Sequence, residues 1–173
     1  MIKNDSTAET GLNASVYNEL RERLVTGRMG PGHELSTRSI AAELGVSQTP
    51  VRDALSRLCA EGAVSIRSKR RVRVPPMTRE RFADLLHCRL LLEPDAAADA
   101  LPHLTDAHVA TLRAADSALD AAIAGGDAEA YVLANYNFHF TIYRAQQKRT
   151  QTQLIEMLWV QFGPFMRVAY ERV

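Results

Sequence analysis

Cysteine and long hydrophobic runs are scarce in this sequence of 173 residues. Its two cysteines, Cys59 and Cys88, are too few for a disulfide framework and are most simply reduced thiols. No stretch approaches the roughly 18 consecutive apolar residues that a membrane-spanning helix needs. Residues 1–12 also lack the apolar core of a signal peptide. These absences predict a cytoplasmic protein that has no contact with a membrane.

The charges are distributed unevenly along the chain, although the formal net charge is only +1. Residues 12–79 carry twelve Lys and Arg side chains and six acidic ones, whereas residues 80–173 carry eight basic and twelve acidic ones. A basic N-terminal part beside an acidic C-terminal part indicates that the N-terminal part binds nucleic acid. The basic run at residues 67–73 is equally compatible with a solvated surface segment when charge alone is considered.

The most informative segment is the amphipathic stretch SQTPVRDALSRL, which begins at Ser47. Ser47 is a suitable N-cap, and Pro50 fits a first helical turn because its missing N–H takes no helical hydrogen bond. Val51, Leu55 and Leu58 share one face, which we expect to be buried. The exposed part of the first turns carries side chains that bond base edges and phosphates, namely Gln48, Thr49 and Arg52. The segment therefore predicts a helix that packs with one face and reads DNA with the other.

The segments around this helix follow the order of a winged helix-turn-helix. Residues 37–44 predict a short helix, and Gly45 suits the left-handed conformation at its end. Residues 16–25 predict an amphipathic helix upstream, while residues 63–66 and 71–74 predict two short strands joined by a basic tip. In a helix-turn-helix the second helix enters the major groove. The two short helices alone are compatible with an ordinary helical hairpin, and the flanking segments favour the DNA-binding unit.

Beyond Val74 the patterns are helical only. The paired prolines of VPPMTRE predict a short, stiff connector. Helices are expected over residues 79–101, 105–124, 127–146 and 150–170. The predicted organisation is a flexible N-terminal arm (1–12), a winged helix-turn-helix domain (13–74), a linker (75–79) and an all-α helical domain (80–173). The predicted fold is therefore mainly α, with a helical bundle after the DNA-binding domain.

The segments from Val16 to Val74 resemble the DNA-binding domain of the GntR family of bacterial transcription regulators. The resemblance rests on VYNELRERLVTGRMGPGHEL followed by STRSIAAELGVSQTPVRDALSRLCAEGAV. It implies a sequence-specific regulator, more often a repressor, that binds an inverted repeat of operator DNA as a homodimer and associates with the bacterial nucleoid through that DNA. The residues that it assigns to DNA contact are Arg38, Ser47, Gln48, Thr49, Arg52, Lys69 and Arg70.

Two positions depart from this family pattern. Gln48 stands where relatives usually carry arginine, which implies an altered base preference. The wing tip usually carries glycine, whereas this chain has Lys69, Arg70 and Arg71. Only glycine lets the backbone come close to the floor of the minor groove, so the contact of this wing is expected to be looser and more purely electrostatic.

The second half resembles the FCD effector domain of the fatty-acid-regulator branch of that family, through RLLLEPDAAADA and NYNFHFTIYRAQQKRTQTQLIEML. The resemblance implies a small effector, frequently a carboxylate, bound beside a divalent metal such as zinc. Its metal ligands map onto Asn135 and His139, which share one helix face at i and i+4. Asn135 replaces an aspartate, and a neutral amide oxygen binds a cation more weakly. Because the family domain continues through further helices that carry more histidines, the domain is expected to be incomplete at Val173.

Arg89 and Tyr143 are the candidate effector-binding residues of the second domain. Arg89 could hold a carboxylate through two parallel hydrogen bonds, and an ion pair within the protein is an equal alternative. His139 could likewise be a packed side chain instead of a ligand. Enzyme function is disfavoured because the sequence has no nucleophile–base arrangement, phosphate loop or HExxH motif. A dimeric DNA-binding protein without an effector or metal site is the remaining alternative, which a response of DNA binding to a metabolite would exclude.

Overall fold

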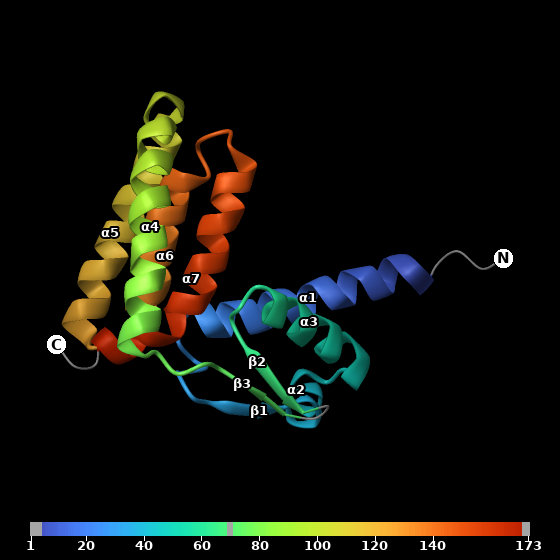
Figure 1. Ribbon diagram of the computed structural model, residues 1–173. Helices are drawn as coiled ribbons and strands as arrows, with labels where there is room; N and C mark the ends of the chain where they lie inside the picture. The colour runs from blue at the N-terminus through green and yellow to red at the C-terminus, as the bar shows by residue number, and fades with distance from the viewer. Residues whose placement is uncertain (1–4, 69–70, 171–173) are drawn as a thin grey trace.

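The computed structural model describes residues 5–68 and 71–170, which form a small head and a helical bundle (Figure 1). The elements of the head are α1 (Asp5–Val25), β1 (Glu34–Ser36), α2 (Thr37–Leu44), α3 (Gln48–Ala60), β2 (Ser65–Ser68) and β3 (Arg71–Arg73). Those of the bundle are α4 (Arg79–Ala100), the 3-10 helix η1 (Leu101–His103), α5 (Asp106–Gly125), α6 (Ala128–Tyr143) and α7 (Arg149–Tyr170). This element order confirms the mainly α fold with an N-terminal winged helix-turn-helix. No helix of the described residues is both long and apolar enough to cross a membrane.

The head is organised around the apolar faces of α1 and α3. Leu20 and Leu24 of α1 are fully buried, as are Val51 and Leu58 of α3. Helix α2 ends at Gly45, whose positive φ of 66° gives the left-handed C-cap that the sequence predicts. The stripes expected from the sequence therefore form the core of the helix-turn-helix.

The wing is a three-stranded antiparallel sheet in the order β1-β3-β2. Leu35 of β1 and Ile66 of β2 both pair with Val72 of β3. The predicted hairpin is present, but β2 begins two residues later than predicted, because the Ala63 amide donates to the Leu58 carbonyl at the end of α3 and not to a neighbouring strand. Strand β1 was not predicted, since three residues are too short to produce an alternating pattern.

Helix α1 begins at Asp5, so residues 5–12 are helical where the sequence predicts a flexible arm. Ala8, Glu9 and Leu12 favour helix. Extending a packed helix adds one hydrogen bond per residue without a new nucleation step. The polar composition of this segment therefore did not distinguish an arm from the first turns of α1.

Helices α4, α5 and α6 of the bundle begin at polar caps. Thr78, Thr105 and Asp127 accept hydrogen bonds from backbone amides at the starts of α4, α5 and α6. At Thr105 the cap is reciprocal, since His108 bonds back to the Thr105 amide at 3.0 Å. Helix α5 ends at Gly126, again in the left-handed conformation. Sequence and structure agree on these boundaries to within a few residues.

The hydrophobic core continues from the head into the bundle. Leu20 and Leu24 belong to the same buried cluster as Phe140 of α6 and Trp159 of α7. Helix α7 approaches α1 closely at Gly163, where an added Cβ would lie 2.6 Å from the Cα of Val25. Head and bundle are therefore packed against each other.

Candidate DNA-binding face and effector cavity

The beginning of α3 forms a polar hollow together with the beginning of α2. Its volume is about 500 Å³, and its lining residues are Ser36, Thr37, Arg38, Gln48 and Arg52. Arg38, Gln48 and Arg52 are exposed, and Arg52 Nη2 donates a hydrogen bond of 3.2 Å to Gln48 Oε1. The structure thus brings together three of the residues that the sequence assigns to DNA contact, opposite the buried face of α3.

Ser47 stands at the N-cap position of α3, but its side chain makes no capping hydrogen bond, which corrects the role predicted for its hydroxyl. The third residue of the helix is Pro50, which has no N–H to donate to the cap. Ser47 and Thr49 are both exposed at this end of the helix. The Ser47 hydroxyl is therefore left available for a group outside the chain.

The basic wing tip is described only in part, because Lys69 and Arg70 lie outside the described residues. Arg71, the first residue of β3, is exposed, and its Nη1 lies 3.7 Å from Glu34 Oε2 on β1. An ion pair this exposed contributes little to stability. The positive charge of Arg71 is therefore available at the edge of the sheet.

A second cavity, of about 450 Å³, lies between α4 and α6. Its lining residues are Leu86, Arg89, Leu90, Glu93, Pro94, Ala97, Phe138, His139, Ile142 and Tyr143. Three residues singled out in the sequence, Arg89, His139 and Tyr143, therefore meet at one place. The fourth, Asn135, is on α6 but is not one of the residues that line this cavity.

Glu93 is the residue of this cavity that the sequence analysis missed. Its carboxylate accepts hydrogen bonds from Arg89 Nε at 2.6 Å, Tyr143 Oη at 2.9 Å and Trp159 Nε1 at 2.8 Å. The guanidinium of Arg89 also lies over the rings of Trp159 and Phe162, 4.5 and 4.6 Å from their centroids. The i, i+4 spacing of Arg89 and Glu93 was the signal available in the sequence. The alternative of an ion pair within the protein is thus what the structure shows for Arg89.

The environment of the cavity keeps Tyr143 and His139 uncharged. Burial raises the pKa of Tyr143, and the adjacent Glu93 carboxylate raises it further. Burial lowers the pKa of His139, which outweighs the opposite effect of Glu93. The two side chains touch, with 3.2 Å between Tyr143 Oη and His139 Nδ1. At neutral pH the cavity therefore holds one ion pair and two neutral polar groups.

The lowered pKa of His139 predicts a loss of stability in acid. The unfolded chain has a histidine pKa of about 6.5, so it binds more protons than the folded chain as the pH falls below that value. The free energy of unfolding should therefore decrease from about pH 6.5 downward and receive no contribution from His139 above it. Urea unfolding between pH 8 and pH 5 tests this against a His139→Gln variant, which should show the shallower decrease. Identical pH profiles would contradict the prediction.

The residues present do not fit a metal centre. Asn135 and His139 offer one neutral amide and one imidazole, and among residues 5–68 and 71–170 no group of three or more His, Cys, Asp or Glu side chains could hold an ion. The carboxylate of Glu93, which lines the same cavity as His139, is already hydrogen-bonded to three residues, Arg89, Tyr143 and Trp159. The divalent metal expected from the resemblance therefore has no complete ligand set among the described residues.

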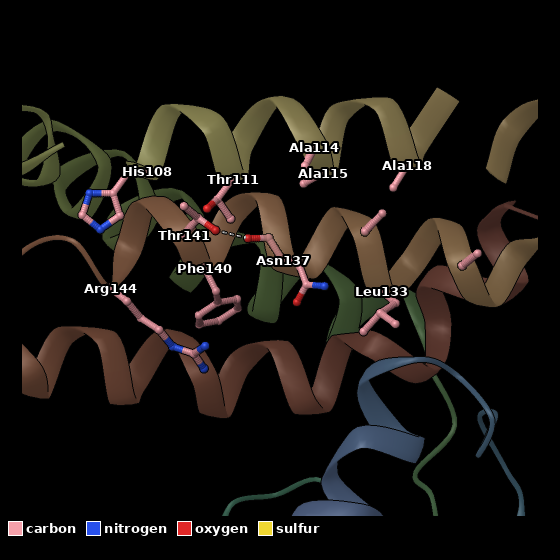
Figure 2. Close-up of a pocket in the computed structure, with 12 residues that line it drawn as sticks. His108, Thr111, Ala114, Ala115, Ala118, Leu133, Asn137, Phe140, Thr141 and Arg144 are labelled. Carbon is pink, nitrogen blue, oxygen red and sulfur yellow. Dashed lines mark hydrogen bonds between the residues drawn. The ribbon is translucent and has the colours of Figure 1, made fainter. Parts of the chain in front are cut away.

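A larger hollow of about 690 Å³ lies between α5 and α6 (Figure 2). The small side chains Ala114, Ala115 and Ala118 line it from α5, as Figure 2 shows. Arg144 stands at one end, where its Nη2 is 2.6 Å from Glu156 Oε1 and 3.0 Å from Tyr136 Oη. This hollow contains neither Arg89 nor Tyr143, and its one arginine, Arg144, is paired within the protein.

Comparison with known families agrees with this two-part organisation. Residues 12–74 match the family described as bacterial regulatory proteins, gntR family, and residues 84–173 match the FCD domain. The HTH-type transcriptional regulator McbR of Escherichia coli (strain K12) is 33% identical, over 94% of this chain and 73% of its own length. The gluconate operon transcriptional repressor of Bacillus subtilis (strain 168) is 32% identical, over 93% of this chain and 63% of its own length.

The same relation is seen in three dimensions. The structure of E. coli McbR/YncC matches with a TM-score of 0.88 and 33% identity, covering 94% of this chain and 76% of the other. Sequence and structure together cover both the head and the helical bundle. The chain therefore belongs to the GntR family of bacterial regulatory proteins and is a DNA-binding transcriptional regulator with an FCD domain.

Proposed function

We propose that this regulator reads operator DNA with the beginning of α3 and that a small carboxylate in the α4–α6 cavity controls the reading. The observation that carries the first part is the polar hollow in which Arg38, Gln48 and Arg52 meet. The buried stripe of α3 holds the helix in place, so Gln48 and Arg52 face outward from a rigid element. As in relatives named repressors, binding to the operator would block transcription.

The proposed contacts divide into two kinds. Gln48 and Arg52 bond base edges in the major groove, whereas Arg38, Ser47 and Thr49 bond phosphates and fix the register. Lys69 and Arg70 add phosphate contacts from the wing. A homodimer would present two such faces to the half-sites of an inverted repeat, as two-fold symmetric regulators do.

An Arg52→Ala variant should bind the operator about 10- to 100-fold more weakly, because a bidentate base contact contributes about 1–3 kcal/mol of discrimination. The operator can be selected from random-sequence DNA with the unaltered protein, and fluorescence anisotropy at fixed salt then measures affinity. An Arg113→Ala variant removes an exposed arginine of α5 and serves as the control. Unchanged operator affinity of Arg52→Ala would refute this docking.

A Lys69→Ala variant should instead weaken binding to all sequences and flatten the salt dependence.

The carboxylate is proposed from the chemistry of Arg89. The bonds to Glu93 use two of the five N–H donors of its guanidinium, so a ligand carboxylate can share that group with Glu93 or replace it. The Tyr143 hydroxyl, now on Glu93, would donate to the same ligand. Apolar residues such as Leu86 and Ile142 would contact its hydrocarbon part. Binding of the carboxylate in this way needs no metal.

A thermal-shift screen of small carboxylates, with and without zinc, tests the proposed effector. A carboxylate that binds only the folded protein stabilises it by about 2.7 kcal/mol at a hundred times its Kd, and Arg89→Met should abolish the shift. A shift that requires zinc would show that the chain acquires a metal ligand set. No shift with any acid would favour the alternative, a DNA-binding dimer without an effector, which the complete internal pairing of Glu93 also allows.

A further inference from the structure

Within a single turn, helix α7 bonds to a residue of the α4–α6 cavity and to the end of α3, the helix proposed to read DNA. Trp159 is 1% exposed and donates from Nε1 to Glu93 Oε1 at 2.8 Å. Gln161, two residues further on, donates from Nε2 to the backbone carbonyl of Glu61 at 2.9 Å. Two residues rotate the direction of a helical side chain by roughly 200°, so these side chains point to nearly opposite sides of α7.

The second of these contacts is built from four residues, which we name the α7–α3 contact: Gln161, Arg81, Glu61 and Gly62. Arg81 Nη2, from the beginning of α4, donates to Gln161 Oε1 and to the Gly62 carbonyl, both at 2.9 Å. The Gln161 amide thus uses its oxygen for Arg81 and its nitrogen for Glu61. Gly62 has a φ of 73°, and a Cβ there would lie 3.1 Å from the Gln161 side chain.

Glu61 ties this contact to the body of the head. It is the C-cap residue of α3, and its carboxylate accepts bonds from Tyr17 Oη at 2.8 and 2.9 Å and from Arg57 Nε at 3.2 Å. Burial, together with the bond to Glu61, raises the pKa of Tyr17 to about 12, so Tyr17 stays a donor at neutral pH. The end of α3 is therefore held from α1, α4 and α7 together.

We propose that α7 transmits the state of the α4–α6 cavity to α3, the helix proposed above to read DNA. Trp159 senses the change through its bond to Glu93, and the α7–α3 contact passes the change on to α3. The regulatory meaning of this coupling rests on the effector role proposed above. A ligand that draws the Glu93 carboxylate away from Trp159 removes a bond that positions α7. Because packed helices shift as rigid units, the displacement reaches Gln161 and weakens its hydrogen bond to the Glu61 carbonyl. Trp159 and Gln161 act here as positioning residues.

Amide hydrogen exchange of the full chain tests the coupling without any ligand. The amides of Glu61, Gly62 and Ala63 bond to carbonyls of the last turn of α3 at 3.0, 3.0 and 2.9 Å and report on the end of this helix. Trp159→Phe removes the bond to Glu93, and exchange at these three amides should become at least about threefold faster. The same substitution in a Gln161→Ala background should add no further acceleration, because the link is already cut.

Tyr143→Phe is the matched control. It also removes one hydrogen bond to Glu93, but from α6 instead of α7. It should leave the exchange at residues 61–63 unchanged. If Trp159→Phe does not fold, Trp159→Met takes its place, because its flexible apolar side chain also lacks the indole donor to Glu93.

Two outcomes would overturn the coupling: equal acceleration by Tyr143→Phe, or the same effect of Trp159→Phe with and without Gln161. These outcomes are independent of the carboxylate screen. If the exchange results are as expected but no carboxylate stabilises the protein, the proposed effector is refuted and the transmission through α7 is retained. If a carboxylate binds but the exchange results are not as expected, the effector is retained and the transmission through α7 is refuted.

Discussion

A Glu93→Ala variant is expected to lose about 3–5 kcal/mol of unfolding free energy, because it leaves the Arg89 guanidinium largely buried without a counter-charge. The side chains of Arg89 and Glu93 are each only 14% exposed, so water cannot replace the lost partner at low cost. Trp159 and Tyr143 lose their acceptor in the same variant. Urea unfolding at pH 7 measures the effect.

The double variant Arg89→Met/Glu93→Ala separates the lost charge from the lost volume. Removing both charges eliminates the unpaired guanidinium, so the double variant should recover a large part of the stability lost by Glu93→Ala. If Glu93→Ala unfolds at nearly the urea concentration of the unaltered protein, then Arg89 is not held as the structure describes, and its role in the cavity has to be abandoned.

A Gly163→Val variant is expected to be less stable by about 1–3 kcal/mol and to separate α7 from α1. A Cβ at Gly163 would lie 2.6 Å from the Val25 Cα and 2.7 Å from the Leu24 carbonyl oxygen, which are backbone atoms that cannot rotate away. This collision opposes the gain of up to about 1 kcal/mol that replacing a helical glycine brings at an open position. The collision outweighs this gain in helix stability because α1 and α7 are both packed and cannot move apart freely.

Gly125 provides the matched control for this substitution. It is the last residue of α5, and a Cβ there would meet nothing within 4 Å. Gly125→Ala should therefore leave the thermal unfolding temperature unchanged or raise it slightly. A Gly163→Val variant as stable as Gly125→Ala would show that α1 and α7 do not approach each other as described.

Helix α3 could be predicted from the sequence because its information is local. Pro50, the apolar stripe from Val51 to Leu58 and the glycine before the turn lie within a few residues of one another, and each has one obvious structural use. The capping role of Ser47 was the exception. Two local rules conflict there, because a proline in the first turn removes one of the amides that the cap would bind.

The cavity could be predicted only in part, because its geometry depends on residues that are distant in sequence. His139 was predicted from the family resemblance and Arg89 from the chemistry of its guanidinium, and the structure brings both together with Tyr143. Glu93 was overlooked since its other donors, Tyr143 and Trp159, are 50 and 66 residues away. The same limit applies to β1, whose three residues gain their strand character only by pairing with β3.

Control of DNA binding by the effector is measured as the operator affinity of the full chain with and without the carboxylate found in the thermal-shift screen. We expect saturating acid to change the Kd for operator DNA by about 5- to 150-fold, which corresponds to a coupling free energy of about 1–3 kcal/mol. We also expect Arg89→Met to abolish this response while leaving the affinity for DNA without acid unchanged. An identical Kd with and without saturating acid would contradict effector control, because a ligand that does not distinguish the two states of the head cannot regulate DNA binding.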